Sequence, residues 1–433
     1  MKASICKSEV KGRVIVPSSK SYTIRGLMCA ALARGKSEIV YPLSSDDTKA
    51  CLDVLGKVGI HVRRRGDFWQ VTGGELHEPN TDLFCGDSAA TLRFMTAISS
   101  LIPGKCRLVA APSLSKRPIK VLIQALRQLG VHCSCRGEVA PVVVEGGRLE
   151  GGVAELPGNV SSQFISALLF IAPFAEEGTK IRLSTPLESK PFVLMTIECL
   201  REFGVNVEFT KDLGEFAVSK QAYGPTKYQV EGDWSSASYF LALGALSGGI
   251  EVENLNLESL QGDKMILNFL REMGASVEVT SPSTPSPFTG EGWGEVKVRR
   301  SRLNAIQADL SNCIDLLPTM AVLSATADGA SEFTGIDRAR VKESNRVAAL
   351  KEGLERMGIK VAEEKDKLTI VGGEPKGSVI DAWDDHRIAM AFGILGLVAG
   401  ETVINNAECV SKTFPEFWDV IRDIGCEVKL NGK

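Results

Sequence analysis

A single phrase recurs six times along this chain and limits what it can fold into. In each copy an apolar, helix-forming stretch ends in glycine and is followed by a short run rich in β-branched residues. Because glycine tolerates the positive φ that often ends a helix, and β-branched residues favour strands, the pattern predicts six copies of one helix–turn–strand element. The copies lie 67 to 84 residues apart and are marked by Gly59, Gly130, Gly204, Gly274, Gly358 and Gly425.

The longest interval, between Gly274 and Gly358, contains a segment rich in proline, serine and glycine at 281–296. This composition is typical of an exposed loop. Without about 14 of these residues the interval returns to about 70, so the period of the repeat is kept. We therefore interpret 281–296 as an insertion in a regular repeat.

A second phrase alternates with the first. Small polar residues open a helix that is apolar on nearly all sides, a pattern typical of N-terminal capping and of a buried helix. Each repeat is therefore expected to contain one buried helix, one amphipathic outer helix and several strands. A period near 70 residues is typical of a small α/β unit used six times. The copies of the second phrase begin at Ser18, Gly86, Gly158, Gly232, Asp309 and Trp383.

Two groups of three units would form two globular domains, as the length of 433 residues favours. The fourth unit begins near Glu231, so the boundary is expected between Gln229 and Glu231. The first strand is predicted at 4–16, ahead of the first helix, and from the repeat alone it could belong with either half.

Composition excludes several classes of protein. A net charge of −3 and a pI near 6.0 disfavour a general nucleic-acid or membrane-surface binder. The longest apolar stretch, 388–400, is shorter than the roughly 20 residues of a membrane span, and charged residues near the N-terminus disfavour a signal peptide. Eleven scattered cysteines do not form a disulfide framework, and four histidines lack ligand spacing. We expect a cytoplasmic protein without a metal site.

Cations gather near the predicted helix starts, where the positive end of the helix dipole disfavours them unless an anion or a carboxylate is present. Any one of them alone is usually solvated or paired, but together they predict a substrate with several negative groups. The set consists of Lys20, Arg25, Arg93, Lys116, Arg117, Lys190, Lys342, Arg346, Arg387 and Lys412.

Two acidic residues stand out among these cations. Asp315 lies between apolar neighbours, so its carboxylate must be paired or have a shifted pKa. Glu343 lies between Lys342 and Arg346 and fits either an ordinary surface i,i+3 pair or a functional role.

At this point the residues match a family. Seven segments, in order and over the full length, resemble the 5-enolpyruvylshikimate-3-phosphate (EPSP) synthase family. They are PSSKSYTIRGL (17–27), SKRPIKVL (115–122), GNVSSQFISALL (158–169), EGDWSSASYFLA (231–242), RVKESNR (340–346), DDHRIAMAF (384–392) and SKTFPEFW (411–418).

The resemblance implies transfer of the enolpyruvyl group of phosphoenolpyruvate to the 5-hydroxyl of shikimate 3-phosphate, through a non-covalent tetrahedral intermediate, with release of phosphate. It implies two inside-out α/β barrel domains with three βαβαββ units each. One domain would contain 1–18 with 231–433 and the other 19–230, with the active site in the cleft between them. It implies no cofactor and small-molecule partners only, and we expect a monomer. Two anionic substrates would also explain many cations with few counter-charges.

The resemblance also implies roles for individual residues, according to their positions in the matching segments. The resemblance implies catalytic roles for Asp315, Glu343 and Lys20. Asp315 fits the base for the 5-hydroxyl, whereas either Glu343 or Lys20 could protonate the methylene carbon of phosphoenolpyruvate. The shikimate 3-phosphate contacts would be Lys20, Ser21, Arg25, Ser161, Ser162, Gln163, Ser189, Asp315 and Lys342. The phosphoenolpyruvate contacts would be Lys20, Ala89, Arg117, Gln163, Arg346, Arg387 and Lys412, where guanidinium groups suit carboxylate and phosphate.

Ala89 departs from the family pattern, because most relatives have glycine there. Its methyl group is expected to narrow the phosphoenolpyruvate pocket and to weaken binding of the longer inhibitor glyphosate.

Two alternatives to this activity remain. The sister enzyme that acts on UDP-N-acetylglucosamine shares the fold, but it usually carries a reactive cysteine where this chain has APSLSKRP (111–118). A non-catalytic scaffold that binds a polyanion would not require Asp315 and Glu343.

Overall fold

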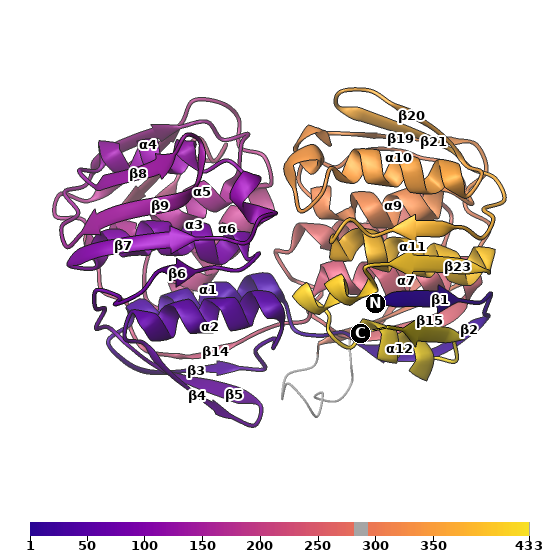
Figure 1. The fold of residues 1–433 in the computed structure, drawn as a ribbon, viewed down its shortest axis with the longest axis horizontal. Coiled ribbons are helices and arrows are strands. Elements are labelled where there is room, and N and C mark those ends of the chain that lie inside the picture. Colours follow the sequence, from indigo (N-terminus) through magenta and orange to yellow (C-terminus); the bar gives the residue numbers. More distant parts are fainter. Residues whose placement is uncertain (281–292, 433) are drawn as a thin grey trace. The chain divides into compact units, whose positions relative to one another are not determined.

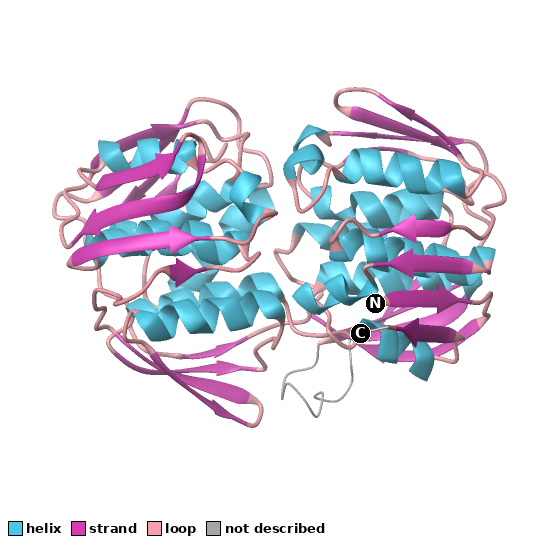
Figure 2. Ribbon diagram, viewed as in Figure 1, coloured by secondary structure: helices cyan, strands magenta, loops and turns pink. Residues whose placement is uncertain are grey.

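The computed structural model describes residues 1–280 and 293–432. The chain divides into two compact units (Figure 1), one formed by Met1–Pro17 with Glu231–Lys433 and the other by Ser18–Val230. We call them the discontinuous unit and the central unit. In each unit the strands lie outside a helical interior (Figure 2). Within the described ranges, no helix has both the length and the apolar character needed to cross a membrane.

The central unit contains three four-stranded sheets, with strand orders β14-β3-β5-β4, β6-β7-β9-β8 and β10-β11-β13-β12. In each sheet the first two strands are parallel and the other pairs are antiparallel. The strands are β3 (Gly35–Val40), β4 (His61–Arg65), β5 (Phe68–Gly73), β6 (Leu83–Phe84), β7 (Gly104–Val109), β8 (His132–Arg136), β9 (Val139–Gly146), β10 (Gly152–Leu156), β11 (Thr179–Leu183), β12 (Glu208–Phe209), β13 (Glu215–Val218) and β14 (Lys227–Gln229).

The discontinuous unit repeats this plan with strand orders β16-β17-β15-β2, β18-β19-β21-β20 and β22-β23-β1-β24. Its N-terminal strand β1 therefore lies between two strands made near the C-terminus. The strands are β1 (Lys2–Ile5), β2 (Val10–Ile15), β15 (Gly248–Leu255), β16 (Ser276–Thr280), β17 (Gly294–Arg299), β18 (Gln307–Asp309), β19 (Ala330–Thr334), β20 (Lys360–Glu363), β21 (Lys367–Val371), β22 (Val379–Asp381), β23 (Thr402–Asn405) and β24 (Val428–Asn431).

Buried and outer helices alternate along the chain, which confirms six βαβαββ units. The buried helices are α1 (Lys20–Leu32), α3 (Ala89–Ile98), α5 (Ser162–Ile171), α7 (Trp234–Ser247), α9 (Leu317–Ser324) and α11 (His386–Ala399). The outer helices are α2 (Asp46–Lys57), α4 (Lys120–Gln128), α6 (Lys190–Glu202), α8 (Ile266–Glu272), α10 (Arg346–Arg356) and α12 (Phe417–Asp423). Short 3₁₀ turns are η1 (Ser99–Leu101), η2 (Leu114–Lys116), η3 (Ala172–Phe174), η4 (Gly262–Met265), η5 (Ile314–Leu316), η6 (Asp337–Val341) and η7 (Ala407–Lys412).

The two sequence phrases correspond to the two ends of these helices. All six repeat glycines have φ between +81° and +95° and lie two positions after the last residue of an outer helix, so the predicted positive φ is confirmed. Five buried helices begin after a capping residue whose side chain accepts a backbone N–H of the first turn. The capping residues are Ser19, Ser88, Ser161, Asp233 and Asp385. The sixth, α9, instead continues from η5, with proline in its first turn.

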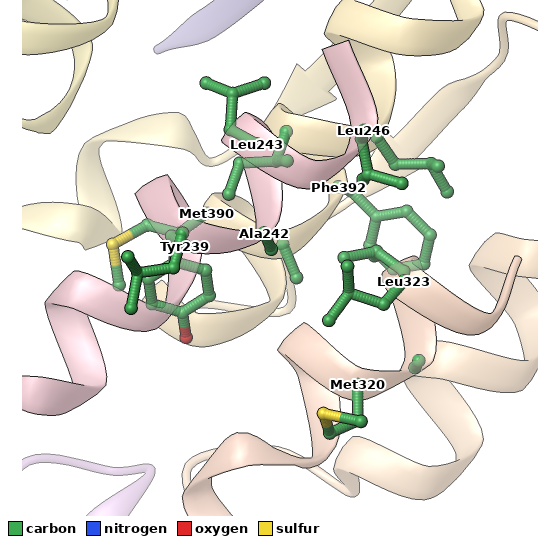
Figure 3. Close-up of a cluster of buried hydrophobic side chains, with 14 of the residues drawn as sticks. Tyr239, Ala242, Leu243, Leu246, Met320, Leu323, Met390 and Phe392 are labelled. Atoms are coloured by element: carbon green, nitrogen blue, oxygen red, sulfur yellow. The ribbon is translucent and has the colours of Figure 1, made fainter. Parts of the chain in front are cut away.

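The core of the discontinuous unit forms where its three buried helices meet (Figure 3). Tyr239 and Leu243 of α7 lie with Met320 of α9 and with Met390 and Phe392 of α11, all of them buried. Because these helices are apolar on nearly all sides, their N-terminal ends are the places where polar side chains can gather. Those ends carry the candidate site.

Two boundaries differ from the sequence-based expectation. The strand predicted at 4–16 is two strands, β1 and β2, which pair in different sheets because a short loop redirects the chain between them. The predicted insertion at 281–296 is too long at its end, because 294–296 already pair in β17. The part of this insertion at 281–292 lies outside the described residues.

Candidate active site

Arg346 is the centre of an ion-pair cluster in the discontinuous unit. It begins α10, is 1% exposed, and uses all three guanidinium nitrogens. Its Nη1 lies 2.7 Å from Asp315 Oδ1, its Nη2 lies 2.6 Å from Glu343 Oε2, and its Nε lies 2.8 Å from Asp385 Oδ2. Burial lowers the pKa of Arg346, but these three carboxylates outweigh burial and raise it well above its usual range. The cluster therefore holds a permanent buried cation.

Asp315, in η5, contacts three cations. Besides Arg346, Lys342 Nζ lies 3.3 Å from its Oδ1 and Arg387 Nη2 lies 3.4 Å from its Oδ2. Its side chain is 12% exposed. Burial alone would raise the pKa of Asp315, but Arg387, Lys342 and Arg346 together hold it well below its usual range. The expectation that this carboxylate must be paired is confirmed.

The other two cations respond differently to the same surroundings. Burial lowers the pKa of Lys342 to about 8, although Asp315 opposes the shift. The pKa of Arg387 is lowered by burial but raised overall by Asp315. Lys342 is therefore the cation of this cluster whose charge can change near neutral pH.

The sequence-based expectation of few counter-charges is wrong for this unit. Asp315, Glu343 and Asp385 all contact Arg346, and Glu343 is only 15% exposed, so its pair with Arg346 is largely buried and not a surface pair. Asp385 was not among the predicted site residues. Its position before an apolar helix marked it only as a cap, and it accepts the N–H of Arg387 in that role.

Lys412 ends η7 in the same unit and is half-buried. The contacts described for residues 1–280 and 293–432 do not connect Lys412 to the Arg346 cluster. The structure therefore brings together five of the predicted residues of this unit, namely Asp315, Lys342, Glu343, Arg346 and Arg387.

Arg25 is the most deeply buried predicted cation of the central unit. It lies on α1 and donates from Nε to Thr196 Oγ1 (2.8 Å), from Nη1 to the Ser21 carbonyl (3.0 Å) and from Nη2 to the Phe192 carbonyl (3.0 Å). Burial lowers the pKa of Arg25, although it stays far above neutrality for a guanidinium. No carboxylate of the described residues forms an ion pair with it. A buried cation of this kind, beside the N-terminal turn of α6, favours a bound anion.

Ser189 lies directly before α6, which begins beside Arg25. It is 2% exposed and has φ +53°, a left-handed conformation that a serine rarely adopts. A residue held in this conformation by its surroundings is a common feature of binding sites.

The start of α5 carries three further predicted residues. Ser161 caps the helix by accepting the N–H of Gln163, and Ser162 is buried in the first turn. Arg93 of α3 donates to Gln163 Oε1 at 2.6 Å and lies over the Phe164 ring. Arg93 was noted only as a cation, and here it fixes the orientation of the Gln163 amide.

The remaining predicted residues of the central unit lie at helix starts or turns. Lys20 begins α1 and forms an ion pair of 3.1 Å with Asp47, so its charge also has a counter-ion. Ser21 follows it on the same helix. Ala89 is the first residue of α3 and is 7% exposed, and Arg117 is buried directly after η2.

Comparison with known proteins agrees with this architecture. A family model described as EPSP synthase (3-phosphoshikimate 1-carboxyvinyltransferase) matches residues 6–421. A 3-phosphoshikimate 1-carboxyvinyltransferase of Dehalococcoides mccartyi is 48% identical over 430 residues, covering 99% of each chain. One from Methanococcoides burtonii is 39% identical over 438 residues, covering 100% of each.

Solved structures show the same fold. An EPSP synthase of Acinetobacter baumannii matches with a TM-score of 0.82 and 27% identity, over 99% of this chain and 100% of that chain. The enolpyruvyl transferase NikO of Streptomyces tendae matches with a TM-score of 0.79 and 16% identity, over 99% of this chain and 98% of that chain. The fold is therefore that of the enolpyruvyl transferases. Within this class the chain belongs to the EPSP synthase family.

Proposed function

We propose that this protein transfers the enolpyruvyl group of phosphoenolpyruvate to the 5-hydroxyl of shikimate 3-phosphate, giving 5-enolpyruvylshikimate 3-phosphate and phosphate. Membership of the family supports this reaction. The observation that carries the proposal is a largely buried carboxylate, Asp315, held ionised by Lys342, Arg346 and Arg387.

Asp315 is proposed as the base that takes the proton from the 5-hydroxyl. A carboxylate bound to three cations is a weak base, because the cations stabilise its charged form. Phosphate and carboxylate groups of the substrates would engage the same cations and weaken their hold on Asp315. Its basicity would therefore rise when both substrates are bound, which limits proton abstraction to the complete complex.

The second proton goes to the methylene carbon of phosphoenolpyruvate, from Glu343 or Lys20. Addition then gives a non-covalent tetrahedral intermediate. The reaction is completed when phosphate leaves and the new methyl group returns its proton to the residue that supplied it. We propose that shikimate 3-phosphate contacts Lys20, Ser21, Arg25, Ser161, Ser162, Gln163, Ser189, Asp315 and Lys342. For phosphoenolpyruvate we propose Lys20, Ala89, Arg117, Gln163, Arg346, Arg387 and Lys412.

The deciding experiment measures phosphate released from phosphoenolpyruvate with each of two acceptors, shikimate 3-phosphate and UDP-N-acetylglucosamine. Release with shikimate 3-phosphate alone is expected. Release with the UDP-sugar alone would favour the sister enzyme. Absence of release with either, in a folded protein that binds shikimate 3-phosphate, would favour the non-catalytic scaffold.

Binding of shikimate 3-phosphate is expected to weaken at alkaline pH, where Lys342 loses its charge. Because its pKa is about 8, the ammonium loses its charge as the pH rises through that value, and an anionic ligand loses a partner. The KM for shikimate 3-phosphate should rise about tenfold between pH 7.5 and 9.5, whereas Lys342→Arg, which stays charged, should show at most about a threefold rise. An equal rise in both proteins would mean that another group titrates. Lys351→Arg, at an exposed ion pair of α10, is the matched control.

Ala89→Gly is expected to increase inhibition by glyphosate. One methyl group in a tight pocket changes binding by about 10- to 200-fold, so the inhibition constant should fall by at least about tenfold while the KM for phosphoenolpyruvate changes less. Ala90→Gly, one residue further along α3, controls for the effect of a glycine on the helix. Unchanged inhibition in Ala89→Gly would contradict the proposed place of this methyl group.

A further inference from the structure

Asp263 contacts the candidate site indirectly and has no assigned role. It lies in η4, is 5% exposed, and its Oδ2 accepts a hydrogen bond from the Ser235 hydroxyl. The same Ser235 oxygen accepts a hydrogen bond of 2.8 Å from Arg387 Nη1. A continuous chain therefore connects Asp263, Ser235 and Arg387.

The loop before Asp263 is fixed to the start of α7, so this chain has a defined geometry. Glu231 accepts hydrogen bonds from the side chains of Asn256, Ser259 and Gln261. Gln261 also accepts the N–H of Trp234 at 3.0 Å, which joins the loop to the first residue of α7. Asp263 lies two residues after Gln261, and Ser235 directly follows Trp234.

Charged and polar groups around Asp263 act on its ionisation in both directions. Arg387 and the hydrogen bond from Ser235 stabilise its ionised form, whereas Asp315 and Asp233 disfavour it, and the Cys313 thiol lies near it. Burial dominates and raises the pKa of Asp263 to about 7. Its second oxygen, Oδ1, is buried, and within the described parts of the chain no donor reaches it. That oxygen is therefore the atom on which a proton can sit.

We propose that Asp263 is a positioning residue that holds Arg387 through Ser235, and that it takes up a proton on Oδ1 when an anion binds to Arg387. The inference deepens the proposed function and rests on it, because the anion would be the phosphate or carboxylate of phosphoenolpyruvate. An anion at Arg387 neutralises the charge of the cation that favours ionised Asp263. A proton from solvent then forms an O–H bond on Oδ1 and leaves again when the anion dissociates.

The consequence is that ionised Asp263 competes with the ligand for Arg387, whereas protonated Asp263 does not. Asp263→Asn keeps an oxygen that can accept from Ser235 but is neutral at every pH. The KM for phosphoenolpyruvate in the wild type is divided by that in Asp263→Asn at the same pH. This ratio removes the effect that ionisation of the ligand itself has on both KM values. We expect this ratio to be near 1 at pH 6 and to rise by about three- to tenfold by pH 8.5.

A second variant separates positioning from charge. Asp263→Ala removes the acceptor for Ser235, so Arg387 loses part of its support. The KM for phosphoenolpyruvate should rise about tenfold at both pH 6 and pH 8.5, with the KM for shikimate 3-phosphate within about twofold. Asp263→Asn should restore the lower KM at pH 6. Asp419→Asn, which changes an exposed carboxylate of the same unit, should match the wild type throughout.

Calorimetry with inorganic phosphate tests the inference without turnover. In two buffers of different ionisation enthalpy at pH 7, the wild type should take up as much as about half a proton more per phosphate than Asp263→Asn, because a group with a pKa of about 7 is half protonated there. Equal uptake and a flat KM ratio would overturn the protonation. Equal changes in both KM values for Asp263→Ala would overturn the positioning role. Failure of the wild type to use phosphoenolpyruvate would instead reject the proposed function.

Discussion

We expect Asp315→Asn to lower kcat by about three orders of magnitude, in the range typical of a lost general base. The amide cannot accept the proton of the 5-hydroxyl, yet it is nearly the same size as the carboxylate. Arg346 keeps Glu343 and Asp385 as partners in this variant, so the cluster retains most of its structure. The KM for shikimate 3-phosphate should change by less than about tenfold. Steady-state kinetics with both substrates measures the effect.

The matched control for Asp315→Asn is Asp337→Asn, which changes an exposed carboxylate in η6. Its kcat should stay within about twofold of the wild type. Circular dichroism and binding of shikimate 3-phosphate establish that each variant is folded. If folded Asp315→Asn retains more than about a tenth of the wild-type kcat, Asp315 is an ion-pair partner of the cations and not the base.

Arg346→Met is expected to destabilise the discontinuous unit by about 3–5 kcal/mol, because it leaves three carboxylates without their shared buried cation. The affected groups are Asp315, Glu343 and Asp385. Asp315 keeps Lys342 and Arg387 as partners, whereas the pairs of Glu343 and Asp385 with Arg346 are lost. Thermal and urea unfolding of both proteins measure the effect, which should appear as a lower melting temperature for Arg346→Met.

Arg356→Met is the control for this substitution, since Arg356 lies on the same helix and forms an exposed ion pair with Glu352. Its effect should be below about 1 kcal/mol. A destabilisation of Arg346→Met no larger than that of Arg356→Met would contradict the role of Arg346 as the shared cation of the three carboxylates. Arg346→Lys should restore only part of the stability, because one ammonium cannot reach three carboxylates as a guanidinium does.

Local sequence signals predicted much of the fold. Gly59, Gly130 and the other repeat glycines have the positive φ that their position after a helix indicated. Capping residues such as Ser19 and Asp385 marked the starts of buried helices. Both signals work because they depend on residues within one turn of each other. The division of 4–16 into two strands depends on partners more than 200 residues away, at 248–255, which local patterns do not contain.

The candidate site was predictable in residue type but not in pairing. The cations near helix starts and Asp315 among its apolar neighbours were visible in the sequence. Their counter-charges were not, because Asp385, the partner of Arg346 directly before α11, lies 39 residues away and reads as an ordinary cap. Asp263 gave no signal at all, since only the hydrogen bonds of the preceding loop place it beside Ser235.

The position of β1 has a consequence for biosynthesis. Residues Lys2–Ile5 form the strand between β23 and β24, so both of its partners are translated only after residue 401. The central unit, in contrast, is complete once Val230 has emerged and can fold during translation. β1 can therefore pair only after 402–405 have left the ribosome, and its sheet closes only after 428–431 have followed. An N-terminal fusion that delays this strand would slow maturation of the discontinuous unit without affecting the central one.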